Sequence, residues 1–168
     1  MENLSAEQPK EVRYAGFWLR FVAYIIDDLI LGFVGFILSL PFIGGIVFSG
    51  LSIAESEENF ESIAPGIAGI FGSIFGIILV TAAAGWLYFA LMESSKTQGT
   101  LGKMALSLQV TDMEGKRISF ARATGRYFGK IISGMIFMIG YIIAGLTEKK
   151  QALHDIMASC LVIRKPLE

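Results

Sequence analysis

The stretch that decides the fold is LRFVAYIIDDLI, which runs from Leu19 to Ile30. It has the apolar character of a membrane helix but carries three charged side chains, Arg20, Asp27 and Asp28. A charge at the centre of a membrane helix costs roughly 2.5–3.5 kcal/mol on insertion scales, whereas each Leu or Ile contributes only about 0.3–0.6 kcal/mol. We therefore expect these charges to lie near the interface, to pair with another segment or to face a wet cavity.

Helical geometry separates the three charges. Arg20 and Asp27 are seven positions apart, so they share one helix face at an axial separation of about 10 Å. Both side chains tilt toward the helix N-terminus, which makes them poor direct partners. Asp28 is rotated by about 100° from Asp27. We expect the two carboxylates to have different environments, and we expect the partners of the three charges on the segment from Arg122 to Asp155.

The composition is that of a membrane protein. The chain has 168 residues, 54% of them hydrophobic and 17% charged, and its mean hydropathy is +0.61. The N-terminus has no short apolar region followed by a small-residue cleavage site, so the first hydrophobic segment is expected to stay in the mature protein. The single cysteine, Cys160, and single histidine, His154, exclude a zinc site of ordinary ligand spacing. We expect no metal, no cofactor and no nucleic-acid partner.

Three apolar runs follow one another along the chain. Pro41 and the pair Gly44-Gly45 interrupt the first run, so we predict that the helix kinks or ends near Leu40, although the span could instead start near Leu29. The third run is marginal as a span, because it has only 16 residues between Ile131 and Leu146. We predict a flexible polar N-terminus at 1–12 and one membrane domain at 13–168, with spans at about 17–40, 63–92 and 128–147 and a cytosolic segment at 93–127.

Charge distribution orients these runs. The segment from Glu93 to Lys130 is rich in Lys and Arg and is cytosolic by the positive-inside rule, which places the N-terminus in the cytosol. The Glu-rich loop from Glu55 to Glu61 is then outside. If the third run crosses the membrane, the basic tail lies outside, against the rule. If the run is re-entrant, the tail stays in the cytosol. Both alternatives remain open.

Strand patterns lie within the basic segment. The stretch ALSLQVT, Ala105 to Thr111, alternates apolar and polar residues, and DMEGK after it is typical of a turn. We predict a β-hairpin whose second strand is Arg117–Phe120. The stretch CLVIR, Cys160–Arg164, is a candidate third strand, provided that it lies on the same side of the membrane. The predicted fold is thus an all-α membrane protein with two to three transmembrane helices and a small cytosolic β element.

The order of these motifs resembles the RDD family of small bacterial membrane proteins, over about residues 14–165. The matching positions are Arg20-Phe21, Ala23, Ile26–Leu29, Thr97–Phe120, Arg122-Ala123, Arg126, Gln151–Asp155, Ala158 and Val162. One small departure is Ser159-Cys160, where the family usually has Gly-Thr. The resemblance implies three membrane segments, the bacterial cytoplasmic membrane and a role in transport of ions or small solutes.

The candidate site gathers the charged positions of these motifs. As a transport site they would line a path for a cation or proton, and intramembrane carboxylates are functional candidates by default. In a structural alternative, the two Asp pair with Arg126 or with the basic segment and attach the cytosolic part to the membrane helices. In the same alternative, His154 lies on a solvated face and Asp155 caps a short helix. The candidate residues are Arg20, Asp27, Asp28, Arg126, His154 and Asp155.

Two functions from different classes follow. The first is transport of cations, protons or small solutes. Transport would need a homo-oligomer, because a single chain has few helices to enclose a path. Gly72 and Gly76 form a GxxxG helix-packing motif that is a candidate contact in such an oligomer. The second is a non-transporting membrane anchor or regulator that docks a partner protein through the basic segment. We do not expect an enzyme, because adjacent Asp residues on a helix diverge and no Ser/His/Asp arrangement is readable.

Overall fold

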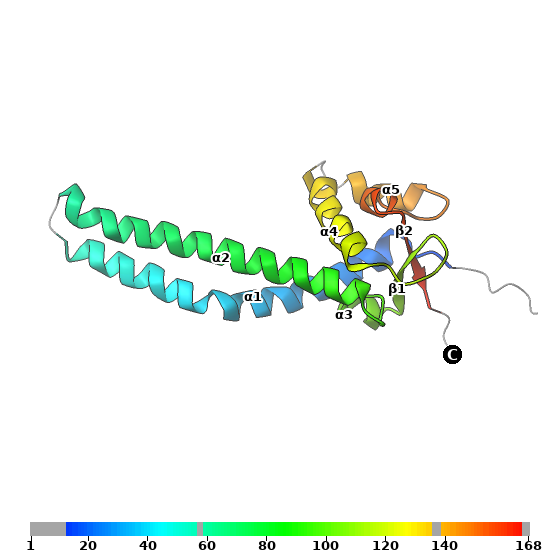
Figure 1. Cartoon of the computed structure of the whole chain (residues 1–168), viewed down its shortest axis with the longest axis horizontal. Coiled ribbons are helices and arrows are strands. Elements are labelled where there is room, and N and C mark those ends of the chain that lie inside the picture. Colours follow the sequence, from blue (N-terminus) through cyan, green and yellow to red (C-terminus); the bar gives the residue numbers. More distant parts are fainter. Residues whose placement is uncertain (1–12, 57–58, 136–138, 166–168) are drawn as a thin grey trace, which may run out of the picture.

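Two long helices dominate the molecule (Figure 1). The computed structural model describes residues 13–56, 59–135 and 139–165. Helix α1, Phe17–Ala54, and helix α2, Phe60–Ser94, form an antiparallel hairpin, and every shorter element gathers where α1 begins and α2 ends. Both helices are long and apolar enough to cross a membrane, and most of their large hydrophobic side chains are exposed. We call residues 95–135 and 139–165, at that end, the cap.

The first long helix does not end where the sequence predicted. The alternative that the helix ends near Leu40 is wrong, because α1 continues through Pro41 to Ala54 as one helix, and the alternative of a kink there stays a prediction. Proline removes a backbone hydrogen bond, but membrane helices tolerate it where a neighbouring helix supports the chain. Here α2 provides that support, since the ring of Phe42 lies directly over Gly76. The bounds of α2 agree closely with the predicted span at 63–92.

Small residues let α1 and α2 approach closely, but they are not the predicted pair. A Cβ atom at Gly66 or Gly69 would lie within 2.4 Å of side-chain atoms of α1, and one at Gly76 would meet Phe42 at 2.2 Å. A Cβ atom at Gly72 would meet nothing within 4 Å. The close face of α2 therefore includes Gly76 but not Gly72, and its contact is with α1 of the same chain.

The cap contains four short helices and two strands. After α2 the chain forms helix α3, strand β1 and helix α4, and after the gap at 136–138 it forms α5, α6 and β2. The strands pair antiparallel, with Val110 opposite Val162. Residues 13–15 run along the other side of β2, where Ala15 N donates to Val162 O at 2.8 Å. The bounds are α3 Leu101–Ala105, β1 Leu108–Asp112, α4 Phe120–Met135, α5 Ile139–Leu146, α6 Leu153–Met157 and β2 Cys160–Arg164.

The predicted hairpin is wrong in its second strand. The turn after β1 forms as predicted, since the Asp112 carboxylate accepts from the backbone of Lys116 at 2.7 Å and Gly115 has a φ of +81°. However, Arg117–Phe120 makes no strand. Ile118 enters the core instead, and the Ser119 hydroxyl accepts a backbone hydrogen bond at the start of α4. The partner of β1 is the candidate third strand, Cys160–Arg164.

The third apolar run is divided between α4 and α5. Neither helix is long enough to cross a bilayer, and among residues 13–56, 59–135 and 139–165 only α1 and α2 qualify as spans. The predicted span at 128–147 includes residues 136–138, which lie outside the described residues, so it stays a prediction. Strand pairing also places residues 13–15, β1 and β2 together at one end of the molecule. The predicted flexible N-terminus at 1–12 lies outside the described residues.

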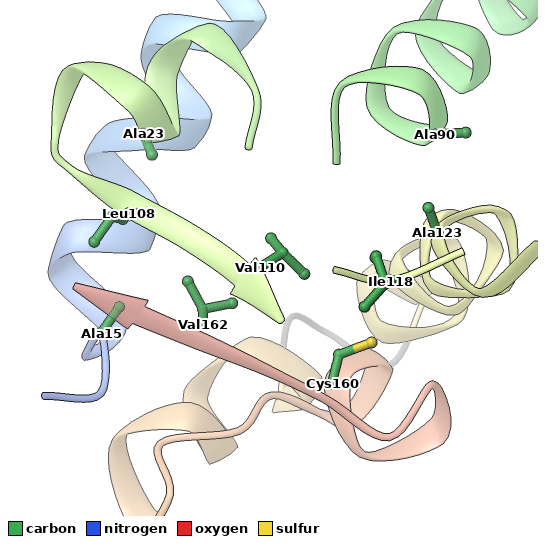
Figure 2. Close-up of a cluster of buried hydrophobic side chains, with 9 residues drawn as sticks. All are labelled: Ala15, Ala23, Ala90, Leu108, Val110, Ile118, Ala123, Cys160 and Val162. Carbon is green, nitrogen blue, oxygen red and sulfur yellow. The ribbon is translucent and has the colours of Figure 1, made fainter. Parts of the chain in front are cut away.

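A small hydrophobic core holds the cap on the long helices (Figure 2). Its strand side chains face alanines of α1, α2 and α4, and small alanine side chains let helices and sheet pack closely. The buried members are Ala15, Ala23, Ala90, Leu108, Val110, Ile118, Ala123, Cys160 and Val162. This core is small, so we expect the polar contacts beside it to contribute to the attachment of the cap.

Candidate functional site

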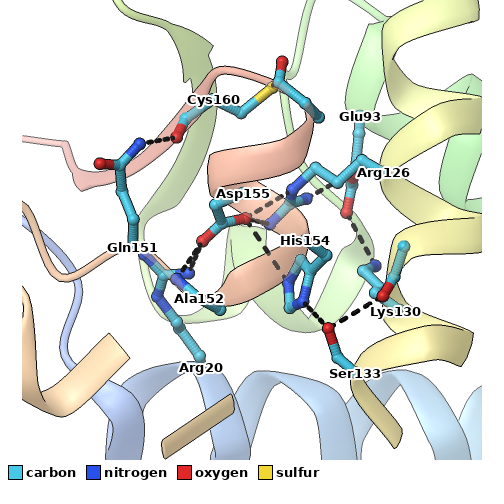
Figure 3. A network of polar contacts seen from close by, with 12 residues as sticks. Arg20, Glu93, Arg126, Lys130, Ser133, Gln151, Ala152, His154, Asp155 and Cys160 are labelled. Carbon is cyan, nitrogen blue, oxygen red and sulfur yellow. Dashed lines mark hydrogen bonds and ion pairs between the residues drawn. The ribbon is translucent and has the colours of Figure 1, made fainter. Parts of the chain in front are cut away.

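Asp155 is the centre of a buried ion-pair network (Figure 3). Its carboxylate accepts hydrogen bonds from Arg20 and from Arg126, whose Nε lies 2.8 Å from Oδ1. It also caps α6, because the backbone N–H of Ala152 donates to it at 3.1 Å. Burial alone would raise the pKa of Asp155, but the charges of Arg126 and Arg20 outweigh burial and lower that pKa. The carboxylate is therefore ionised at neutral pH.

Arg20 ties the first turn of α1 to the C-terminal part of the cap. Besides its ion pair with Asp155, it donates to the backbone oxygens of Lys150 at 2.6 Å and Ala15 at 2.9 Å. The predicted location of its partner, on the segment from Arg122 to Asp155, is where the structure places it. The guanidinium is suited to this position because its fixed fork can serve several acceptors at once.

Glu93 is the second acid of the network, and it is not among the site residues predicted from the sequence. It lies fully buried in the last turn of α2 and accepts from Lys103, from Lys130 at 3.3 Å and from Arg126 at 2.5 Å. One signal could have identified it, because it is the first charged residue after the long uncharged run that ends at Met92. An acid at the end of a membrane helix that precedes a basic segment has cationic partners nearby.

Arg126 bridges the two acids. Its side chain contacts Glu93 through one nitrogen and Asp155 through two others, and it is 2% exposed. The prediction that it pairs with Asp27 or Asp28 is therefore wrong. Arg122, one turn earlier on α4, is exposed and does not join this network in the part of the chain that the structure describes.

Asp27 and Asp28 have different environments, as their rotation predicted. Asp27 is 1% exposed and accepts from the hydroxyl of Tyr88 at 2.7 Å, the hydroxyl of Thr100 at 2.5 Å and the backbone N–H of Gly102 at 2.8 Å. The predicted location of its partners, on the segment from Arg122 to Asp155, is therefore wrong. Only glycine fits at 102, because a Cβ atom there would lie 2.1 Å from the backbone oxygen of the facing turn of α1. Asp28 is exposed on the outer side of α1.

His154 is buried, so the predicted position on a solvated face is wrong. Its ring lies between the Ser133 hydroxyl, 3.4 Å from Nδ1, and the Asp155 carboxylate, 3.5 Å from Nε2. Burial lowers the pKa of His154 to about 3, because the attraction of Asp155 only partly offsets desolvation and the nearby cations. The imidazole is neutral at physiological pH, and it packs the network rather than adding charge to it.

A cavity of about 310 Å³ adjoins this network. All six helices border it, from α1 to α6, and its walls are largely apolar. The side chains at its polar side are Arg20, Asp27, Lys103, Arg126, Lys130 and His154. Within the described residues no group of three His, Cys, Asp or Glu side chains could hold a metal ion. The arrangement therefore offers fixed charges and hydrogen-bond donors beside an apolar space.

Comparison with known proteins identifies the family. The chain is 37% identical to YxaI of Bacillus subtilis over 155 residues, which cover 90% of this chain and 97% of YxaI. It is 31% identical to the membrane protein YteJ of the same organism over 161 residues, which cover 92% of this chain and 83% of YteJ. No solved structure matches the chain. The model of the RDD family matches residues 14–159, which include Arg20, Asp27 and Asp155, and the chain therefore belongs to the RDD family.

Proposed function

We propose that this membrane protein transports protons, a monovalent cation or a small solute, with Asp27 as the residue that binds the moving ion or proton. The observation that carries the proposal is the position of the Asp27 carboxylate, which is buried in a long apolar helix and lines the cavity. Its hydrogen-bond partners among the described residues are two hydroxyl groups and one backbone amide, none of them a cation. A carboxylate in this setting is costly to keep and is a functional candidate by default.

The proposed orientation puts the cap in the cytosol of a bacterial cell, below its cytoplasmic membrane. The basic residues of the cap support this orientation through the positive-inside rule. Pairing of β2 with β1 and with residues 13–15 supports placing both termini on the side of the cap. The third apolar run would then enter and leave the bilayer on the cytosolic side.

Cysteine labelling of whole cells tests this orientation. In a Cys160→Ser background, a membrane-impermeant thiol reagent should label Glu55→Cys in intact cells, because that residue lies at the far end of the hairpin. Met113→Cys and Lys165→Cys, both exposed positions in the cap, should react only after lysis. Labelling of Lys165→Cys in intact cells would overturn the cytosolic tail.

Transport by this fold needs more than one copy of the chain. Two long helices cannot enclose a path by themselves, and most of the large apolar side chains of α1 and α2 are exposed on their surfaces. We therefore propose a homo-oligomer in which neighbouring hairpins complete the path across the bilayer. Gly72, which does not face α1, remains available for such a contact.

Ion flux in proteoliposomes tests the transport proposal, and the chain offers a matched control. Asp27→Asn should lower flux of the transported ion at least about tenfold, since it removes a charge that the ion needs, which is about 1.4 kcal/mol or more. Asp28→Asn should leave flux unchanged, because this neighbouring side chain is exposed on the outer side of the helix. Folded wild-type protein without flux of protons, Na⁺ or K⁺ would overturn the proposal, and equal flux in Asp27→Asn would overturn the site.

A second candidate function is a membrane anchor or regulator. It is favoured by one observation: in the described part of the chain, every buried side-chain nitrogen and oxygen has a hydrogen-bond partner. A fully satisfied network is what a purely structural cap requires. The flux assay separates the two functions, because an anchor moves no ion in any variant.

A further inference from the structure

The cavity beside the ion-pair network has one apolar end and one cationic end. Phe21 and Tyr24 of α1 form part of its apolar wall, and they are 39% and 47% exposed. The apolar wall therefore continues onto the outer surface of the helix, where lipid chains would lie. Lys103 and Lys130 form part of its polar end, and both lie near the ring of Phe89 of α2, with Lys130 Nζ 3.8 Å from the ring centroid.

Positive charge exceeds negative charge around the polar end. The network joins four cationic side chains, of Arg20, Lys103, Arg126 and Lys130, to only two acids, Glu93 and Asp155. Asp27 lines the same cavity and still leaves the cations in the majority among the described residues. Each of these cations already contacts an acid, but two acids serve four cations, so a site with this balance favours an anionic occupant.

We propose that this cavity binds the head of an anionic amphiphile, a phosphate or carboxylate group carried on an acyl chain. The anion lies against Lys130 and Arg20, and the first part of the chain lies along Phe21 and Tyr24. A volume of 310 Å³ equals about ten water molecules at about 30 Å³ each, which suits a head and a short part of the chain. The rest of the chain extends along α1 into the bilayer.

This binding differs from the general attraction of basic surfaces to anionic membranes. An exposed basic side chain such as Arg122 attracts any anionic surface, without regard to the shape of the lipid. The cavity instead combines charge with an apolar wall, so it distinguishes an amphiphile from a free anion. The proposal does not depend on ion transport, because an occupied cavity would equally serve an anchor.

Lipid binding to the purified full-length protein in zwitterionic detergent tests the proposal. Native mass spectrometry with phosphatidylglycerol, phosphatidylcholine, oleate and inorganic phosphate separates the sources of the anion. We expect phosphatidylglycerol or oleate to bind about tenfold more tightly than phosphatidylcholine, and inorganic phosphate to displace neither at equal concentration. Equal binding of both phospholipids, or displacement by inorganic phosphate alone, would overturn the proposal.

Two pairs of variants on α4 locate the bound lipid. Gly134 lines the cavity and Gly125 does not, yet a Cβ atom at either position would meet nothing within 4 Å. Gly134→Leu should weaken binding about tenfold while Gly125→Leu leaves it within about twofold. Likewise Lys130→Gln should weaken binding of anionic lipid about fivefold or more, and Arg122→Gln should not. Wild-type affinity in both Gly134→Leu and Lys130→Gln would place the lipid elsewhere and overturn the proposal.

Discussion

Replacing Glu93 with Gln tests whether the ion-pair network holds the cap on the long helices. This single carboxylate contacts Lys103, Lys130 and Arg126, and it is 1% exposed. Gln has the same shape but no charge, so the variant leaves three buried cations without that acid. Breaking a buried ion pair in this way destabilises a protein by about 3–5 kcal/mol. Because Arg126 keeps its ion pair with Asp155, we expect the loss of stability to be about 3 kcal/mol, at the low end of this range.

The single thiol of the chain provides the assay. Cys160 is fully buried in the core of the cap at the start of β2, so a thiol reagent reaches it only when the cap opens. A loss of about 3 kcal/mol should make labelling of the solubilised protein roughly a hundredfold faster. Glu61→Gln is the matched control, because Glu61 lies exposed in the first turn of the same helix. That variant should react within about twofold of the wild-type rate, since surface substitutions rarely exceed 0.5 kcal/mol.

One result would refute this reasoning. All three proteins should react at the same rate once denatured, which shows that the thiol itself is unchanged. If Glu93→Gln then reacts at the wild-type rate under native conditions, the network does not hold the cap. Attachment would rest on the small hydrophobic core around Val110 and Val162 instead.

Two further predictions concern the same end of the molecule. His154 has a pKa of about 3 in the folded chain and 6.5 otherwise, so the unfolded chain binds more protons between these values. Thermal stability should therefore fall below pH 6.5 by up to about 1.4 kcal/mol per pH unit, and His154→Gln should flatten this profile in melting curves. Gly102→Ala should destabilise the folded chain by about 2 kcal/mol or more, because the added Cβ atom would clash with the backbone of α1. Gly125→Ala should stabilise α4 by about 0.5–1 kcal/mol, because the added Cβ atom would lie in open space. Chemical denaturation measures the free energy of unfolding of both variants.

Features that depend on local pattern were predictable from the sequence. Long apolar runs predicted α1 and α2, and rotation about the helix axis predicted that Asp27 and Asp28 differ. The alternating pattern that ends at Thr111 predicted β1. Each of these follows from side-chain spacing within one segment, which a single sequence contains.

Features that depend on packing between segments were not predictable. The continuation of α1 through Pro41 depends on α2 lying beside it, and burial of His154 depends on where α4 and α6 meet. Glu93 looked like the edge of a basic segment, and its role appears only when α4 and α3 bring cations to it. Ile118 is predicted in the second strand of a hairpin because it follows a turn, whereas its side chain enters the core between the sheet and α4.

Two charged side chains in this stretch of α1 hold two different parts of the cap. Arg20 holds the part of the cap around α6 through Asp155, and Asp27 holds α3 through Thr100 and Gly102. These two side chains are seven residues apart, so they lie about 10 Å from each other along one face of α1. The cavity lies beside this face, and its lining includes both Arg20 and Asp27. A substitution that moves Arg20 or Asp27 therefore changes the lining of the cavity. The charges that hold the fold together are in this way coupled to any ion or lipid that binds in the cavity.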